Sequence, residues 1–145
     1  MLDHISLGVN DYWESRKFYD STLSILGIQP VLILETEQRK LSYYCKDEGP
    51  GFGIIQDNEL NTEEFIGKAK GLHIAFRASS IEAVQEWHKK CLELGATDNG
   101  RPGIRERYGP GYYAAFVIDP NGYKLEAVFN EKAFFIRYNF LRSLP

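Results

Sequence analysis

The chain has 145 residues, which is enough for one domain with a sizeable core. Hydrophobic residues make up 43% of it and aromatic residues 14%, and this composition excludes a disordered chain. The 17 basic and 20 acidic residues give a formal net charge of −3, which argues against nucleic-acid binding, and no apolar run approaches the ~20 residues that span a bilayer.

The first predicted elements are a strand and a helix. Residues 4–9 alternate in side-chain character, which is the period-two pattern of a strand. Asp11 followed by Glu14 has the form of a helix cap, and Gly27 stands where a helix would end in a left-handed residue. One stripe of this helix carries residues at helical spacing, namely Phe18, Thr22 and Leu26.

Three strands complete the first half of the chain, at residues 30–35, 41–46 and 52–56. The order strand, helix and three strands defines a first module over residues 1–56. Residues 57–69 are polar, and we interpret them as a linker.

The second half, residues 70–129, follows the same order. A strand is predicted at 73–78, and Ser79 with Glu82 forms a capping box ahead of a second helix. The stripe of that helix is Ile81, Val84, His88 and Cys91, and we interpret His88 as a packing residue. Two closing strands, 112–118 and 123–129, flank an Asp-Pro-Asn-Gly turn.

The two halves are related by an internal repeat. The segments Leu2-Asp3-His4-Ile5-Ser6-Leu7-Gly8-Val9 and Gly71-Leu72-His73-Ile74-Ala75-Phe76-Arg77-Ala78 share one pattern, with the histidines 69 positions apart. At the same offset Phe18 falls on Trp87. We therefore predict a single α+β domain over residues 1–129, followed by an aromatic tail at 130–145.

One face of the predicted sheet carries three candidate metal ligands. The apolar residues of each first strand share the face that the helices would cover, and His4 and His73 lie on the other face. Glu126 falls on that second face of the last strand. Two imidazoles and a carboxylate on one concave surface can bind a divalent ion and leave positions open for water or substrate.

Plainer interpretations stand beside this one. A histidine in a strand is more often a packed or partly exposed residue than a ligand. Glu126 could also be neutralised by an ion pair with Arg77 or Lys124 instead of by a metal.

Longer stretches of sequence carry a family resemblance. The first half contributes Leu2 to Val9, Phe18-Tyr19 and Leu26-Gly27. The second half contributes Gly71-Leu72-His73-Ile74-Ala75-Phe76, Gly109-Pro110-Gly111-Tyr112-Tyr113-Ala114-Ala115-Phe116-Val117 and Asp119-Pro120-Asn121-Gly122-Tyr123-Lys124-Leu125-Glu126-Ala127-Val128. Over residues 2–129 the chain thereby resembles the vicinal oxygen chelate superfamily, which includes glyoxalase I, bleomycin-resistance proteins and extradiol dioxygenases.

This resemblance implies two βαβββ modules that form a curved mixed sheet around a central cavity. It also implies a divalent ion (Zn, Ni, Mn, Fe or Co) in that cavity. The implied metal ligands are His4 and His73 from the first strands and Glu126 from the last strand.

The fourth ligand position of the family is where this sequence differs. Matching residues 52–55 to 125–128 puts Gly53 opposite Glu126, whereas matching the turns puts Ile54 there. A register shift would bring in Gln56 or Asp57 instead. We favour Gly53, which leaves a site of three ligands and water or a site that has lost its metal.

The resemblance implies two classes of function. A metal-dependent enzyme of the lyase, isomerase or dioxygenase type would act on a small substrate with adjacent oxygens, and Glu126 would be its base. The alternative is a metal-free protein that sequesters a small molecule, as bleomycin-resistance proteins do. The missing fourth ligand argues against glyoxalase I turnover.

Candidate substrate-binding residues are Arg77, Arg105, Tyr108 and Tyr113. Arg105 and Tyr108 lie in a glycine-rich segment at 103–109, where we expect the mouth of the cavity, and for Arg107 we favour a solvated loop.

We expect a small-molecule substrate and a homodimer as partners, and neither nucleic acid nor membrane. A cytoplasmic location is expected because Cys45 and Cys91 form no CxxC pair and the N-terminus lacks an export signal.

Overall fold

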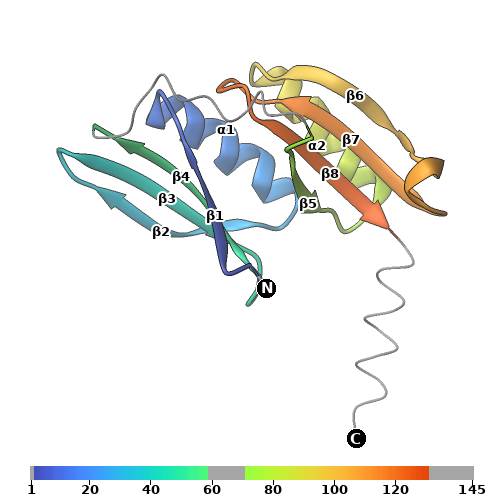
Figure 1. Ribbon diagram of the computed structural model, residues 1–145, viewed down its shortest axis with the longest axis horizontal. Coiled ribbons are helices and arrows are strands. Elements are labelled where there is room, and N and C mark those ends of the chain that lie inside the picture. Colours follow the sequence, from blue (N-terminus) through green and yellow to red (C-terminus); the bar gives the residue numbers. More distant parts are fainter. Residues whose placement is uncertain (1, 59–70, 131–145) are drawn as a thin grey trace, which may run out of the picture.

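The computed structural model describes residues 2–58 and 71–130, and these fold into two four-stranded sheets with two helices (Figure 1). Most of the predicted linker at 57–69 and of the predicted tail at 130–145 lies outside these ranges. The exceptions are residues 57, 58 and 130.

The first module has the predicted order of elements. Its strand β1 (His4–Gly8) runs parallel to β4 (Gly51–Asp57), and the sheet continues through β3 (Arg39–Cys45) to β2 (Gln29–Glu35). The helix α1 (Tyr12–Ile25) follows β1 directly. This β1-β4-β3-β2 order puts β1 at one edge of the sheet and β2 at the other.

The second module repeats this topology. Its elements are β5 (Ile74–Arg77), α2 (Ile81–Glu93), β6 (Thr97–Ile104), the short 3-10 helix η2 (Glu106–Tyr108), β7 (Tyr112–Ile118) and β8 (Lys124–Asn130). The sheet order β5-β8-β7-β6 matches that of the first module strand for strand. The predicted repeat is therefore confirmed. The expected curved sheet consists of two four-stranded sheets that are not closed into a barrel.

The helix caps show one success and one correction. Asp11 caps α1 as predicted, because its carboxylate accepts the Glu14 backbone N–H at 2.9 Å. The cap of α2 is Ser80, one residue later than the predicted Ser79. Ser80 has the extended backbone of a capping residue, and its hydroxyl accepts the Ala83 N–H at 3.1 Å.

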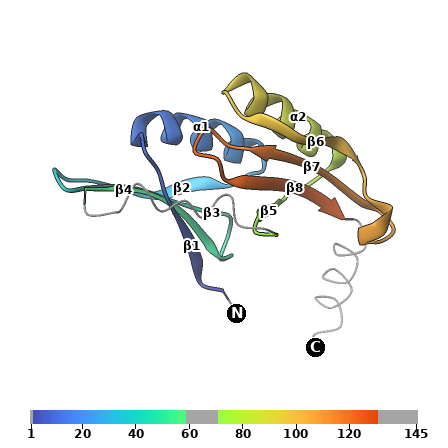
Figure 2. The same ribbon diagram turned by 45° about the horizontal axis from the view of Figure 1, so that its top comes forward.

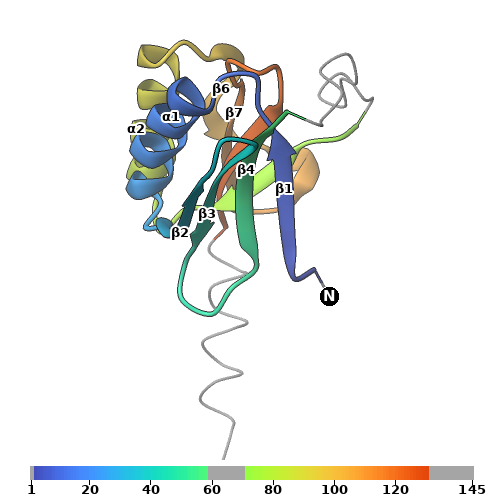
Figure 3. The ribbon, with the colours of Figure 1, turned by 90° about the vertical axis from the view of Figure 1, so that its left-hand side faces the viewer.

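Both helices lie on the same side of the molecule and cover one face of each sheet (Figures 2 and 3). Side chains between these layers form one core that joins the modules, since the rings of Phe52 and Phe76 meet edge to face at 5.1 Å. The opposite faces of the sheets are not covered by α1 or α2. His4 and His73 lie on these uncovered faces, as the strand alternation predicted.

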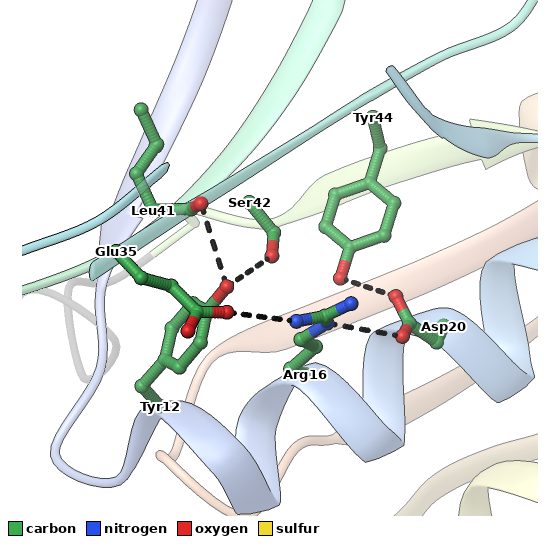
Figure 4. Close-up of polar contacts among 7 residues, drawn as sticks. All are labelled: Tyr12, Arg16, Asp20, Glu35, Leu41, Ser42 and Tyr44. Atoms are coloured by element: carbon green, nitrogen blue, oxygen red, sulfur yellow. Dashed lines mark hydrogen bonds and ion pairs between the residues drawn. The ribbon is translucent and has the colours of Figure 1, made fainter. Parts of the chain in front are cut away.

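Polar contacts fasten α1 to the first sheet (Figure 4). Tyr44 donates a 2.8 Å hydrogen bond to Asp20, which also pairs with Arg16, and Arg16 reaches Glu35 at the end of β2. Tyr12 contacts Ser42 at 2.8 Å. These contacts fix the helix that follows β1 and so fix the edge of the sheet that carries His4.

A second group of polar contacts joins the two modules. The buried Tyr19 hydroxyl on α1 donates to Asp119 at 2.6 Å, and the Tyr123 hydroxyl donates to the carbonyl of Gly8 at 2.8 Å. Asp119 is 4% exposed, and burial raises the pKa of its carboxyl group while the Tyr19 hydroxyl lowers it. The junction between the modules thus contains a buried carboxyl group whose pKa depends on its hydrogen-bond donors.

Equivalent strand registers relate Gly53 to Glu126. In the first sheet Gly53 stands between Ser6 and Tyr43, and in the second sheet Glu126 stands between Ala75 and Phe116. This register supports the alignment that we favoured over Ile54. The place of a fourth side chain is occupied, because a Cβ on Gly53 would lie 2.8 Å from the Ser6 Oγ and 3.1 Å from the Tyr43 ring.

Within the described ranges, no helix is long and apolar enough to cross a bilayer.

We predict that Tyr19→Phe destabilises the protein in a pH-dependent way. Loss of the donor should lower the free energy of unfolding by about 1–3 kcal/mol at pH 7 and raise the pKa of Asp119 further. A carboxyl group with a raised folded-state pKa loses stability as pH rises from its unfolded value of about 4 through the folded value. The deficit relative to wild type should therefore shrink on acidification, as measured by urea unfolding at several pH values.

Tyr12→Phe is the matched control for this experiment. Its hydroxyl is also buried on α1, but its partners Ser42 and the Leu41 carbonyl are neutral, and Arg16, with which it also interacts, does not titrate at acidic pH. The deficit of this variant should not change over the same pH range. An equal pH dependence in both variants would contradict the role given to Asp119.

We also predict that Gly53→Ala is destabilising because of its two close neighbours. The crowding should cost about 1–3 kcal/mol of unfolding free energy. Removing the nearest atom with Ser6→Ala should recover part of this loss in the double variant, as measured by a double-mutant cycle. Ser6→Ala alone is the control. An additive cycle would show that Ser6 does not occupy the space next to Gly53.

Candidate metal and substrate site

The second sheet holds a buried carboxylate with two donors. Glu126 is 2% exposed, and its Oε2 lies 2.9 Å from Nε2 of His73. Its Oε1 accepts a 2.7 Å hydrogen bond from the Tyr112 hydroxyl. The carboxylate therefore accepts a bond on each oxygen, which offsets part of the cost of burying its charge.

The strand order explains this convergence. β8 lies between β5 and β7, so a side chain of β8 has neighbours from both strands on the same face. His73 immediately precedes β5, and Tyr112 begins β7. The sequence offered Arg77 and Lys124 as ion-pair partners for Glu126, and in the structure its contact partner is His73. Burial and the neighbouring carboxylate raise the pKa of the Tyr112 hydroxyl, which keeps it a donor.

His4 has a different partner on the first sheet. Its Nδ1 lies 2.7 Å from the Asp3 carboxylate, its side chain is 52% exposed, and its ring meets that of Tyr43 edge to face. Because an ionised carboxylate only accepts hydrogen bonds, Nδ1 is the donor in this contact. This is the arrangement by which a carboxylate typically orients a histidine that binds a metal.

The donor set can be tested against the needs of a divalent ion. Two ligands at about 2.1 Å from an ion in octahedral geometry are separated by about 3 Å, which matches the distance from His73 to Glu126. Residues 2–58 and 71–130 contain no group of three or more His, Cys, Asp or Glu side chains arranged to hold an ion. His73 and Glu126 thus fit as ligands by type and spacing. His4 fits by type, but the structure does not bring it to them.

Two neighbouring cavities open beside His73. One of about 270 Å³ lies between the edges of the two sheets and is lined by Ser6 and Gly8 from β1 and by His73, Tyr123 and Lys124 from the second module. The other, of about 240 Å³, lies over the second sheet and is described below. Leu72, His73 and Lys124 line both, so one molecule could extend from one cavity into the other.

The predicted substrate-binding residues have different surroundings. Tyr108 lines the second cavity, whereas the Arg105 guanidinium lies over the Phe116 ring, 5.4 Å from its centroid. Arg77 is exposed on the same face of β5 as His73. Tyr113 lies on the other face of its strand, where it packs against the core and accepts a hydrogen bond from Gln85 of α2.

Sequence reasoning missed two residues of this region. Tyr112, rather than its neighbour Tyr113, reaches Glu126. Strand alternation allows only one of two adjacent tyrosines on each face, and a register from β8 to β7 was needed to choose between them. Arg107, which we expected in a solvated loop, lines the second cavity. His88, in contrast, is the buried packing residue that was predicted, with Asp98 as its partner at 3.0 Å.

Comparison with solved structures finds close similarity in fold. A glyoxalase/bleomycin resistance protein from Albidiferax ferrireducens T118 is 30% identical, with a TM-score of 0.70, and the match covers 88% of this chain and 98% of that one. A glyoxylase/bleomycin resistance protein/dioxygenase domain from Frankia sp. EAN1pec is 18% identical, with a TM-score of 0.66 over 90% of this chain and 97% of that one.

A glyoxalase I mutant from Zea mays shares the fold at 19% identity and a TM-score of 0.69. The match covers 91% of this chain and 47% of that longer chain. A comparison with curated protein sequences found no match.

A family model is matched by residues 1–127, which is nearly the whole part of the chain that contains the two modules. Together with the repeated strand order, this match shows that the chain belongs to the Glyoxalase/Bleomycin resistance protein/Dioxygenase superfamily.

Proposed function

We propose that the protein is a divalent-metal-dependent enzyme that acts on a small molecule with two adjacent oxygens in the cavity between the sheets. The observation that carries this proposal is the contact of 2.9 Å between the buried Glu126 and His73, a residue that lines that cavity. The pair supplies an imidazole nitrogen and a carboxylate oxygen, two of the donor types that bind divalent ions.

Glu126 can exchange one partner without losing the other. Tyr112 holds Oε1, so Oε2 is the oxygen that is released when His73 turns toward an ion or a substrate. The exchange leaves the carboxylate oriented, and Glu126 can then accept a proton from a carbon next to a carbonyl. A bound divalent ion would supply Lewis-acid stabilisation of the negative charge that develops on the substrate oxygens.

His4 would join the site from the first sheet. Asp3 holds its Nδ1, and Nε2 is the nitrogen available to an ion. Gly53 supplies no ligand side chain at the fourth position, where Ser6 and Tyr43 take up the space, so the protein would supply three ligands. A lyase or isomerase reaction uses this arrangement directly. The reduced ligand set is also why we expect weak glyoxalase I turnover.

A second candidate is metal-free binding of a small molecule. It is favoured by the crowding of Ser6 and Tyr43 around Gly53 at the fourth position, and by the pairing of His4 with Asp3. In that case the same cavity would hold the ligand, and Glu126 would stay paired with His73.

We predict that the chain, stripped of metal and titrated with Zn, Ni, Mn, Fe or Co, binds about one ion per chain through His73, Glu126 and His4. His73→Ala, Glu126→Gln and His4→Ala should each weaken binding of the preferred ion at least tenfold in calorimetric titrations. Asp3→Asn should weaken it about 10–100-fold, because Asp3 orients His4. Circular dichroism checks that each variant is folded.

Glu93→Gln is the matched control, since this exposed acid on α2 interacts with lysines of its own helix, Lys90 and Lys89. It should bind the ion as wild type does. If the wild-type protein binds none of the five ions, the result favours the metal-free candidate. Unchanged affinity in His73→Ala and Glu126→Gln would place the ion elsewhere.

A further inference from the structure

The second cavity beside His73 differs in chemistry from the first. Its volume of about 240 Å³ lies below the 300–1,000 Å³ range of typical ligand pockets, so it suits a small molecule or one end of a larger one. Its walls combine rings and polar side chains, namely His73, Phe116, Tyr108, Asn99, Arg107 and Lys124. Every titratable group in this lining other than His73 and Tyr108 is a cation.

Within residues 2–58 and 71–130, Arg107 forms no ion pair with an acid. Among the described residues, no Asp or Glu oxygen lies within 4.0 Å of the Arg107 or Arg105 guanidinium. Arg107 donates instead to the Tyr108 hydroxyl, with its guanidinium carbon 4.6 Å from the centroid of that ring. One N–H of the guanidinium is thus engaged by a neutral partner, and the charge is left for an anion.

A series of ring contacts connects this cation to the buried carboxylate. The Tyr108 ring meets the Tyr112 ring edge to face at 5.3 Å, and Tyr112 donates to Glu126. Arg105 stacks on the Phe116 ring, which in turn contacts the His73 ring at 6.3 Å. The aromatic wall therefore has a cation at one end and the Glu126–His73 pair at the other.

We propose that this cavity binds the carboxylate group of a small planar substrate, with Arg107 as its ion-pair partner and Asn99 as a neutral hydrogen-bond donor. A guanidinium can hold both oxygens of a carboxylate side by side, and flat ring walls favour a planar group attached to it. The inference rests on the proposed function only in that it names the class of substrate for the same site. The cavity itself is present without any ion.

The test measures binding of benzoate, a planar carboxylate, by calorimetry or by shifts in protein NMR spectra with EDTA present. Benzamide is the neutral probe of equal shape, and phenyl phosphate is the competing anion. The variant is Arg107→Gln. Arg101→Gln is the matched control, because that arginine is 90% exposed and lies 3.7 Å from Asp98.

We expect wild type and Arg101→Gln to bind benzoate with affinities within twofold of each other. Arg107→Gln should bind it at least tenfold more weakly, and benzamide should bind wild type at least tenfold more weakly than benzoate does. NMR spectra of Arg107→Gln check that the fold is intact. Phe116→Leu removes an aromatic ring from the cavity lining but no charge, and it should weaken benzoate binding less than Arg107→Gln does.

Three results would overturn the proposal. They are no benzoate binding to wild type, equal binding of benzamide, or unchanged affinity in Arg107→Gln. If phenyl phosphate binds more tightly than benzoate, the cavity recognises a phosphate and the carboxylate proposal is wrong. Because EDTA removes metal, loss of the metal site leaves this experiment unaffected, whereas benzoate binding seen only when metal is added would place the carboxylate on the ion and refute the Arg107 assignment.

Discussion

The candidate site depends on providing hydrogen-bond partners for one buried carboxyl group, that of Glu126. A buried carboxylate without partners would be protonated or would destabilise the fold by several kcal/mol, roughly the scale of a broken buried ion pair. The second sheet prevents this by placing a donor on each side, His73 from the β5 edge and Tyr112 from β7. Because both donors require the β5-β8-β7 order, the site and the topology of the second module cannot be separated.

The first module shows what happens to the same topology without that carboxylate. Gly53 has the register of Glu126, and the space is filled by Ser6 and Tyr43. With no acid at the centre of the first sheet, His4 pairs outward with Asp3 and stays half exposed. The two histidines, equivalent in the repeat, therefore differ in environment: one is bound to the buried acid, and the other is oriented by an exposed one. An ion bound by both histidines would therefore have two unequal sets of ligands, a stronger one on the second sheet and a weaker one on the first.

Much of the fold follows from local patterns in the sequence. Period-two strands, a cap at Asp11 and the His4/His73 repeat were enough to predict two equivalent modules, and alternation alone put His73 and Glu126 on one face. What local patterns do not contain is the pairing of distant strands. Tyr112 and Tyr113 lie on opposite faces of β7, and only the pairing of β7 with β8 shows which of them shares a face with Glu126. Ser79 and Ser80 differ only in where the backbone becomes helical. The cavity position of Arg107 likewise comes from the turn at η2, for which the sequence offers only a glycine-rich segment.

The two cavities have complementary chemistry, and this bears on how a substrate would be oriented. The cavity between the sheets has walls that are largely aliphatic apart from Ser6, His73, Tyr123 and Lys124, whereas the one over the second sheet has the cation Arg107 at its wall. Leu72, His73 and Lys124 line both cavities, so a molecule anchored by an anionic group in the second cavity would lie against side chains that also line the first. The His73 ring forms part of the wall of both cavities and also contacts Oε2 of the buried Glu126, so a ligand in either cavity would meet a side chain that supports the buried acid.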